Sequence, residues 1–259
     1  DLIEFNEIKN KFADLKISNF GNYTSKRKII FVCGMPRSGT TLVEQIISAH
    51  SEVQSLGETD QVQNIINENL NYLNKDFDGL LKDYDFDQNL IYDKYVRYIK
   101  SFNKVEMVYT DKSLFNFKLI GFIKLFFPNT KIIVLKRDFN NNLLSIYKSD
   151  LQSQKLNWSY DANEINNNYK LFIEYLNFWN KLFPNLFLEL NYSDLINNTS
   201  SISRDIVSFC GLKWEDSCLE FYNQNKSPID TASANQANKP VYNTSLNKFE
   251  NYKEFFKLK

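Results

Sequence analysis

One segment constrains the fold of this chain more than any other: residues 34–41 read Gly-Met-Pro-Arg-Ser-Gly-Thr-Thr. The two glycines have the G-x-x-x-x-G spacing of a phosphate-binding loop. Residues 28–33, just before the loop, form a short apolar run typical of a buried strand, and residues 40–50 place their apolar side chains on one helical face. A strand, a glycine loop and a helix in this order predict an α/β fold with a parallel sheet.

Strand-type runs alternate with helical patterns over the rest of the chain. Such alternation favours consecutive βα units, in which the strands lie parallel and the helices cover the sheet. We therefore predict the class α/β, with a central parallel sheet of the P-loop type flanked by helices. The predicted strands are residues 28–33, 107–110, 131–135 and 186–190, and the predicted helices that pack on them are residues 40–50, 114–127, 140–149 and 164–182.

The chain of 259 residues is long enough for one α/β domain. We divide it into residues 1–27, a helix over residues 2–15 followed by a polar linker, and residues 28–259, the main domain. Within the main domain, a helical stretch over residues 61–104, interrupted by an Asp-rich turn, predicts a cap or wall. A Ser-, Asn- and Thr-rich tract over residues 231–247 is typical of a closing lid.

Composition excludes several classes of partner. Lys plus Arg and Asp plus Glu both number 31, so the net charge is zero, and we expect neither nucleic acid nor a membrane as a partner. No apolar stretch approaches the ~18–20 residues of a membrane span, and no signal-peptide core is present, so we expect a cytoplasmic protein. Three cysteines and one histidine, without metal-ligand spacing, predict reduced thiols and no metal site.

The loop carries donors for an anion but not those of a triphosphate site. Gly34 and Gly39 allow the backbone to turn tightly, and the amides of residues 38–41 point from the start of a helix toward the site. Thr40 occupies the position of the lysine that grips the β and γ phosphates in ATP- and GTP-binding loops. Arg37 provides instead a planar fork of N–H donors that suits sulfate or phosphate oxygens. We assign anion binding to Gly34, Pro36, Arg37, Ser38, Gly39, Thr40 and Thr41.

The chain resembles the sulfotransferase superfamily in the segment where that family begins its nucleotide-binding site. The resemblance lies in residues 34–41, in the helix that follows them and in Gly57-Glu58-Thr59. The sequence Pro-Arg-Ser-Gly-Thr-Thr is similar to that of tyrosylprotein and carbohydrate sulfotransferases and of bacterial sulfotransferases that carry tetratricopeptide repeats. The resemblance extends from about residue 28 to residue 249, through several motifs in the expected order. It implies a sulfotransferase-like fold and 3′-phosphoadenosine 5′-phosphosulfate (PAPS) as the sulfuryl donor, with no metal.

Two residues match catalytic positions of the tyrosylprotein enzymes. Glu58 corresponds to the general base, and a hydroxyl that attacks sulfur must lose its proton to such a group. Lys112 corresponds to the catalytic lysine. From the residues alone, Lys112 is a cation at the end of a predicted strand, where open parallel sheets bind ligands. Together with Arg37, it would neutralise charge on the transferred group.

Other residues match positions that contact the donor. Arg137 ends a predicted strand and Ser145 lies in the following helix, so both can converge on one anion, which the resemblance identifies as the donor's 3′-phosphate. The arginine that tyrosylprotein enzymes have four residues after this serine is Ser149 here, so we expect either weaker binding of the 3′-phosphate or binding that Lys148 or another cation completes. The remaining matches to donor-contacting positions are Tyr192, Ser233 and Lys248.

We interpret the chain as a PAPS-dependent sulfotransferase in which Glu58 deprotonates a hydroxyl acceptor. Peptide tyrosine, a sugar and a small hydroxylated molecule remain open as acceptors, as do a homodimer and further sequence before Asp1. One alternative is a P-loop kinase or hydrolase in which Asp111 holds magnesium and Lys112 replaces the missing loop lysine. Another is a non-catalytic nucleotide-binding module whose N-terminal helix docks on a partner. His50, the single histidine, fits a helix C-terminal cap or a hydrogen-bonded structural histidine better than a catalytic base.

Overall fold

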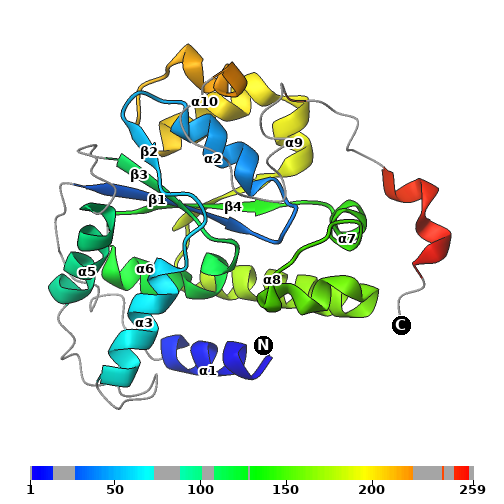
Figure 1. Cartoon of the computed structure of the whole chain (residues 1–259), viewed down its shortest axis with the longest axis horizontal. Helices are drawn as coiled ribbons and strands as arrows, with labels where there is room; N and C mark the ends of the chain where they lie inside the picture. Colours follow the sequence, from blue (N-terminus) through cyan, green and yellow to red (C-terminus); the bar gives the residue numbers. More distant parts are fainter. Residues whose placement is uncertain are drawn as a thin grey trace.

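Five parallel strands form one sheet in the described part of the computed structural model, in the order β2-β3-β1-β4-β5 (Figure 1). This sheet, flanked by helices, confirms the predicted α/β class. The strands are β1 (Lys28–Gly34), β2 (Val53–Ser55), β3 (Val108–Lys112), β4 (Lys131–Lys136) and β5 (Phe187–Asn191). The structure describes residues 2–13, 27–72, 88–100, 108–127, 129–223, 241 and 248–256.

Helices cover both faces of the sheet (Figure 1). Helices α2, α9 and α10 lie on one face, and α5, α6 and α8 lie on the other, where α1 packs on α8 and α3 packs on α5. The α-helices are α1 (Leu2–Ala13), α2 (Thr40–Ser48), α3 (Gln61–Tyr72), α5 (Gln88–Lys100), α6 (Ile120–Phe126), α7 (Phe139–Tyr147), α8 (Ala162–Leu182), α9 (Tyr192–Asn197) and α10 (Thr199–Phe209). The 3₁₀-helices are η2 (Leu114–Leu119), η3 (Gln154–Tyr160), η4 (Asp216–Cys218), η5 (Phe221–Asn223), η6 (Lys248–Asn251) and η7 (Lys253–Phe255).

The central strand β1 supplies side chains to two separate apolar cores, because successive residues of a strand point to opposite faces. Phe31 and Cys33 belong to the core beneath the sheet, with α1, α3, α5, α6 and α8. Ile30 and Val32 belong to the core on the other face, with α2 and α10. A strand covered on both faces reads as a continuous apolar run, and this is why residues 28–33 were recognisable as a strand.

The four predicted strands and the predicted helices are present, with ends shifted by a few residues. The short strand β2 was not predicted, because three residues carry too little pattern, and neither were α9 and α10. The predicted helix over residues 114–127 begins as the 3₁₀-helix η2 and becomes α-helical at Ile120. The predicted lid over residues 231–247 lies outside the described residues except for Val241. The Asp-rich turn at residues 76–87 also lies outside them.

The N-terminal helix α1 confirms the helix predicted over residues 2–15, and it packs into the main core. Its residue Phe12 is fully buried and meets the rings of Phe122 and Trp179 edge to face, with centroid distances of 5.0 and 5.1 Å. Gly121 leaves room for these rings, since a Cβ atom there would overlap Phe12 and would lie 2.7 Å from Trp179. These contacts make α1 part of the apolar core beneath the sheet.

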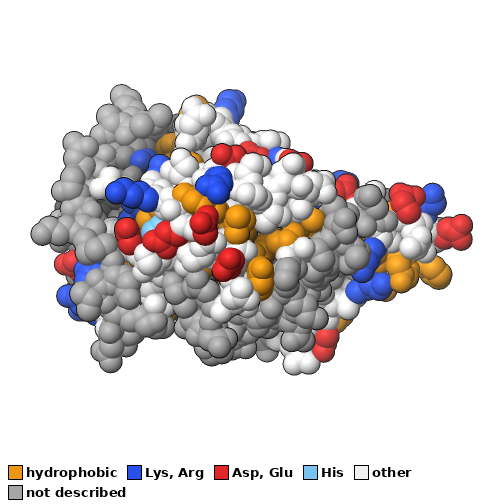
Figure 2. All heavy atoms as spheres, turned by 90° about the horizontal axis from the view of Figure 1, so that it is seen from above, with side chains coloured by type: hydrophobic (Ala, Val, Ile, Leu, Met, Phe, Trp, Pro, Cys, Tyr) orange, Lys and Arg blue, Asp and Glu red, His pale blue; other side chains and the backbone are white. Residues whose placement is uncertain are grey.

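Charges of both signs are interspersed over the described part of the face formed by α2, α9 and α10 (Figure 2). This distribution agrees with a net charge of zero and gives this face no broad field of one sign. Among the described helices, none is both long enough and apolar enough to cross a membrane.

The packing of α1 yields a stability prediction. Truncation in Phe12→Ala should lower the free energy of unfolding by about 3–5 kcal/mol, because it removes a buried ring and leaves a cavity. The control Ile3→Ala lies on the same helix with its side chain 77% exposed and should change the free energy by less than about 0.5 kcal/mol. Urea unfolding followed by circular dichroism measures both. Equal, small effects would show that α1 folds apart from the main domain.

Candidate active site

The loop between β1 and α2 adopts a backbone that only particular residues permit. Gly39 has φ 109°, and a Cβ atom on it would lie 2.5 Å from the Tyr192 ring. Gly34 packs against β4, where a Cβ atom would lie 2.5 Å from the carbonyl oxygen of Leu135. Arg37 also has a positive φ, 63°, which costs a non-glycine residue roughly 1–2 kcal/mol. Such strain in a loop at the carboxyl end of a central strand is characteristic of a functional site.

The start of α2 offers donors that the described residues leave unused. Its N-cap residue, Gly39, provides no side-chain capping bond, so the first amides of the helix have no partner within it. The Ser38 hydroxyl is buried and has no hydrogen-bond partner among the described residues. The Ser38 amide, by contrast, donates to the Met35 carbonyl oxygen at 3.2 Å. The hydroxyls of Thr40 and Thr41 complete a donor set that fits an anionic oxygen group.

Arg137 joins the end of β4 to this loop. Its Nη1 donates to the carbonyl oxygen of Arg37 at 3.0 Å, and its guanidinium lies 4.6 Å from the centre of the Tyr192 ring. Since Tyr192 also covers Gly39, the structure brings together four of the residues predicted to bind the donor: Arg37, Gly39, Arg137 and Tyr192. A contact that we did not predict adds to this arrangement: Asn142 Nδ2 donates to the carbonyl oxygen of Pro36 at 2.9 Å.

Lys112 and Glu58 form an ion pair beside the loop. Lys112 Nζ lies 2.5 Å from Glu58 Oε1 and 3.4 Å from Thr41 Oγ1. The lysine side chain is 1% exposed, whereas that of Glu58 is 42% exposed. Strand β3 pairs with β1 in a register that places Lys112 opposite Val32, two residues before the loop. The pair therefore links a buried ammonium, which faces the loop, to a carboxylate that reaches solvent.

The turn that carries Glu58 is held by Glu44, which sequence reasoning missed. Glu44 is buried on α2, and its Oε1 accepts hydrogen bonds from Ser55 Oγ at 2.8 Å and Thr110 Oγ1 at 3.3 Å. Ser55 Oγ in turn accepts from the amide of Gly57 at 3.0 Å. Burial raises the pKa of the Glu44 carboxyl, and the nearby Lys112 ammonium opposes that effect. Glu44 is the single charged residue of α2, and this was the available signal.

Asp111, the residue that a magnesium-dependent reaction would need, faces away from the loop. Its neighbours in β3, Thr110 and Lys112, contact α2 and the loop, whereas Asp111 accepts hydrogen bonds from Tyr95 Oη at 2.5 Å and Asn116 Nδ2 at 3.2 Å. Burial raises the pKa of Asp111 to about 7, although both hydrogen bonds favour the ionised form. Within the described ranges, no cluster of three His, Cys, Asp or Glu side chains could hold a metal ion.

The remaining predicted donor contacts lie around α7 or outside the described residues. Ser145 is partly exposed on α7, and its carbonyl oxygen accepts from Ser149 Oγ at 2.7 Å. Lys148, our candidate for the missing cation, lies over the Tyr252 ring with Nζ 3.9 Å from the ring centre. Lys248 begins η6, which packs against α7. Ser233 lies outside the described residues.

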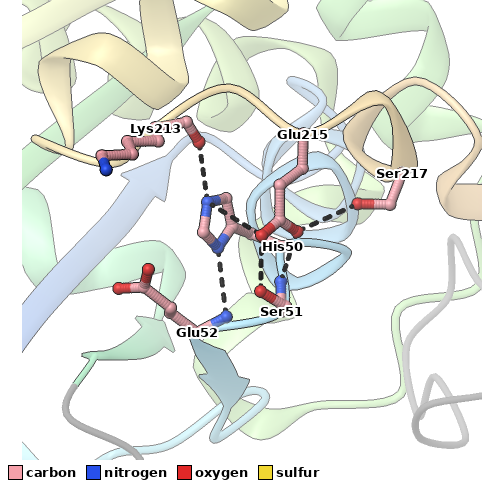
Figure 3. A network of polar contacts seen from close by, with 6 residues as sticks. All are labelled: His50, Ser51, Glu52, Lys213, Glu215 and Ser217. Carbon is pink, nitrogen blue, oxygen red and sulfur yellow. Dashed lines mark hydrogen bonds and ion pairs between the residues drawn. The ribbon is translucent and has the colours of Figure 1, made fainter.

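His50 lies at the far end of α2 from the loop, within a polar network (Figure 3). The helix has nine residues, so its ends are about 13 Å apart. His50 Nε2 lies 2.8 Å from the Lys213 carbonyl oxygen, and Nδ1 accepts from the amide of Glu52 at 3.1 Å. Glu215 accepts two hydrogen bonds from Ser51, at 2.5 and 2.7 Å. These contacts tie the end of α2 to the segment after α10, a structural role.

Comparison with known proteins gives the family. Residues 30–216 match the model of the sulfotransferase family, so the chain belongs to that family. An uncharacterized protein of Aquifex aeolicus (strain VF5) is 35% identical over 248 residues, which cover 90% of this chain and 32% of that protein. The chain thus spans about a third of the length of this curated relative.

Solved structures show the same fold. The sulfotransferase domain of the Synechococcus PCC 7002 olefin synthase is 16% identical, with a TM-score of 0.62 over 89% of this chain and 90% of that one. The sulfotransferase domain of the curacin biosynthetic pathway is 18% identical, with a TM-score of 0.56 over 90% and 92% of the two chains. Mouse sulfotransferase SULT7A1, solved in complex with PAP, is 13% identical, with a TM-score of 0.50 over 91% and 81%.

The buried Asp111 carboxyl predicts a pH-dependent stability. Because its pKa rises to about 7 on folding from 3.8, the folded state keeps a proton that the unfolded state releases. The contribution of Asp111 to the free energy of unfolding should therefore be present below about pH 4 and fall by up to about 1.4 kcal/mol per pH unit as the pH approaches 7. Asp111→Asn should lack this decline.

Urea unfolding between pH 4 and pH 8 measures the effect, with Asp93→Asn, on the exposed face of α5, as the matched control. The control should keep the wild-type pH profile. If Asp111→Asn also kept that profile, the Asp111 carboxyl would be ionised throughout this range and the assigned effect of burial would be wrong.

Proposed function

We propose that this chain transfers the sulfuryl group of PAPS to a hydroxyl acceptor by in-line displacement. The observation that carries the proposal is the position of Lys112, a buried ammonium between Glu58 and the loop hydroxyl of Thr41. One cation is thereby next to both a candidate base and a candidate anion site. Membership in the sulfotransferase family supports sulfuryl transfer as the reaction class.

The donor set of the loop suits the phosphosulfate end of PAPS. The phosphosulfate oxygens would accept hydrogen bonds from donors gathered at the N-terminus of α2. These donors are the Arg37 guanidinium, the hydroxyls of Ser38 and Thr41, and the first amides of the helix. Arg137 and Ser145 would hold the 3′-phosphate at the end of β4. The complex of a mouse sulfotransferase with PAP supports this choice of donor.

Bound at the loop, PAPS supplies an electrophilic sulfur and a bisphosphate leaving group. Glu58, 42% exposed, would take the proton of the acceptor hydroxyl as the oxygen attacks. A protonated Glu58 no longer forms an ion pair, so the Lys112 ammonium would become available to the charge that develops on the bridging oxygen. Arg37 and the α2 amides would stabilise charge on the remaining oxygens. The base and the cation thus act in one coupled step.

Nucleotide binding tests the donor. Calorimetry should show that PAP binds in the absence of metal, and that Arg37→Ala and Arg137→Ala each weaken binding about 10- to 100-fold, since each removes charge-assisted hydrogen bonds of about 1.5–3 kcal/mol. Arg97→Ala, an exposed arginine on α5, is the matched control and should bind as the wild type does.

The alternatives give different results in the same titrations. Tighter binding of ATP with magnesium than of PAP would contradict the proposal and favour a kinase or hydrolase. Binding of neither nucleotide would favour a non-catalytic module. Unfolding curves of both arginine variants verify that a loss of binding is not a loss of fold.

The base is tested by Glu58→Gln. This change keeps the shape of the side chain but removes its ability to accept a proton, so turnover should fall about 10²- to 10⁴-fold. PAP affinity should not fall by more than about twofold, because the ion pair of Glu58 among the described residues is with Lys112 and not with a residue of the loop. Glu52→Gln, an exposed neighbour before β2, is the control and should retain full turnover. Full turnover by Glu58→Gln would exclude Glu58 as the base.

A further inference from the structure

A groove begins at the candidate base Glu58 and leads away from the loop. It consists of two hollows, of 180 and 310 Å³, which share Asp60, Ser113, Phe115 and Lys155 in their walls. Glu58 lines the smaller hollow, so an acceptor hydroxyl placed there would lie beside the base. The two hollows together fall within the range of roughly 300–1,000 Å³ typical of small-molecule sites. We call them the acceptor groove.

Each lysine among the described residues that line this groove is paired with a carboxylate. Lys155 Nζ lies 2.6 Å from Asp60 Oδ2, and Lys118 Nζ lies 2.8 Å from Glu4 Oε2. At the head of the groove, Glu58 is paired with the buried Lys112. The three pairs balance in charge, so the described walls provide no excess of positive charge. A polyanionic acceptor, such as an acidic tyrosine peptide, would find no complementary charge in these walls.

The same ion pairs disfavour a purely apolar acceptor. Covering the Asp60–Lys155 pair, whose side chains are 51% and 55% exposed, would remove water from both without replacing its hydrogen bonds. An acceptor with several hydroxyls can donate to the carboxylates and accept from the ammonium groups. Such an acceptor therefore provides hydrogen-bond partners for the charged groups of the wall. A steroid-like or simple phenolic molecule would leave these groups without hydrogen bonds.

Two aromatic side chains give the groove an apolar surface. Trp158 lines the larger hollow, and its Nε1 donates to the Lys155 carbonyl oxygen at 3.1 Å, which fixes the ring. Phe115 lines both hollows. Flat rings of this kind can contact the C–H faces of a sugar while its hydroxyls meet the polar wall. The walls thus offer aromatic rings for the C–H faces of a pyranose and charged groups for its hydroxyls.

We infer that the acceptor is an uncharged oligosaccharide, with the reacting sugar in the smaller hollow beside Glu58 and the next sugar in the larger hollow beside Trp158. The inference rests on the proposed function. In the reaction, the sugar oxygen forms a bond to sulfur and its proton passes to the Glu58 carboxylate. The bond between sulfur and the bridging phosphate oxygen breaks, and PAP leaves with that electron pair.

A panel of acceptors with ³⁵S-labelled PAPS tests this substrate class. The panel contains lactose, maltose, a hyaluronan disaccharide, an acidic tyrosine peptide and 4-nitrophenol. A neutral disaccharide should be labelled with a kcat/KM at least about tenfold above every other member, since one tenfold step corresponds to a differential binding of about 1.4 kcal/mol. Saturation-transfer NMR with PAP present should also detect its binding without turnover.

Variants locate the acceptor in the groove. Trp158→Ala should raise KM for the neutral disaccharide at least about tenfold and abolish its NMR signal, while PAP affinity stays unchanged. Lys181→Ala, an exposed lysine at the end of α8, is the matched control and should match wild type in both.

The outcomes separate the two proposals. Preferential labelling of the peptide, the anionic disaccharide or the phenol would overturn the inference and leave the sulfotransferase proposal intact. PAP binding with no labelling and no NMR signal for either neutral disaccharide would also overturn it. A protein that binds no PAP and labels no acceptor would instead overturn the proposed function.

Discussion

The ion pair between Lys112 and Glu58 is the interaction on which the candidate site depends. An ammonium with a side chain 1% exposed is costly to desolvate unless a carboxylate neutralises it, so the buried lysine requires Glu58 to reach inward. The amide of Lys112 also donates to the Gly57 carbonyl oxygen at 3.1 Å, which extends the pairing of β3 to the turn that carries the glutamate. The backbone hydrogen bond and the ion pair thereby fix the position of Glu58 relative to Lys112.

Helix α2 serves this arrangement along its whole length. Its first residues face the loop with unused donors, Glu44 in its middle holds the turn before Glu58 through Ser55, and its end is tied down by His50. Glu44 and Lys112 thus belong to a helix and a strand end, and Arg37 and Glu58 lie in the short connections beside them. Such support is what keeps reacting groups at fixed distances.

Local patterns predicted much of the fold and part of the site. The apolar run of β1 and the glycine spacing after it identified the loop, because both features depend only on neighbouring residues. The pairing of Lys112 with Glu58 was not predictable from spacing, since 54 residues separate them in the chain. Glu44 and Asn142 were missed for the same reason: each acts through a partner distant in sequence. The predicted contact of Ser233 remains a prediction.

The sequence by itself determined the class of this protein, because strand and helix periodicity and a glycine-defined turn are encoded within a few residues of each other. It also placed Lys112 and Arg137 at strand ends. Only the tertiary structure decided what these residues meet. The strand order β2-β3-β1-β4-β5 sets the ends of β3 and β4 on either side of the loop, and the pleat turns Lys112 toward it and Asp111 away. Strand order and facing arise from packing across the whole sheet, which no local pattern contains.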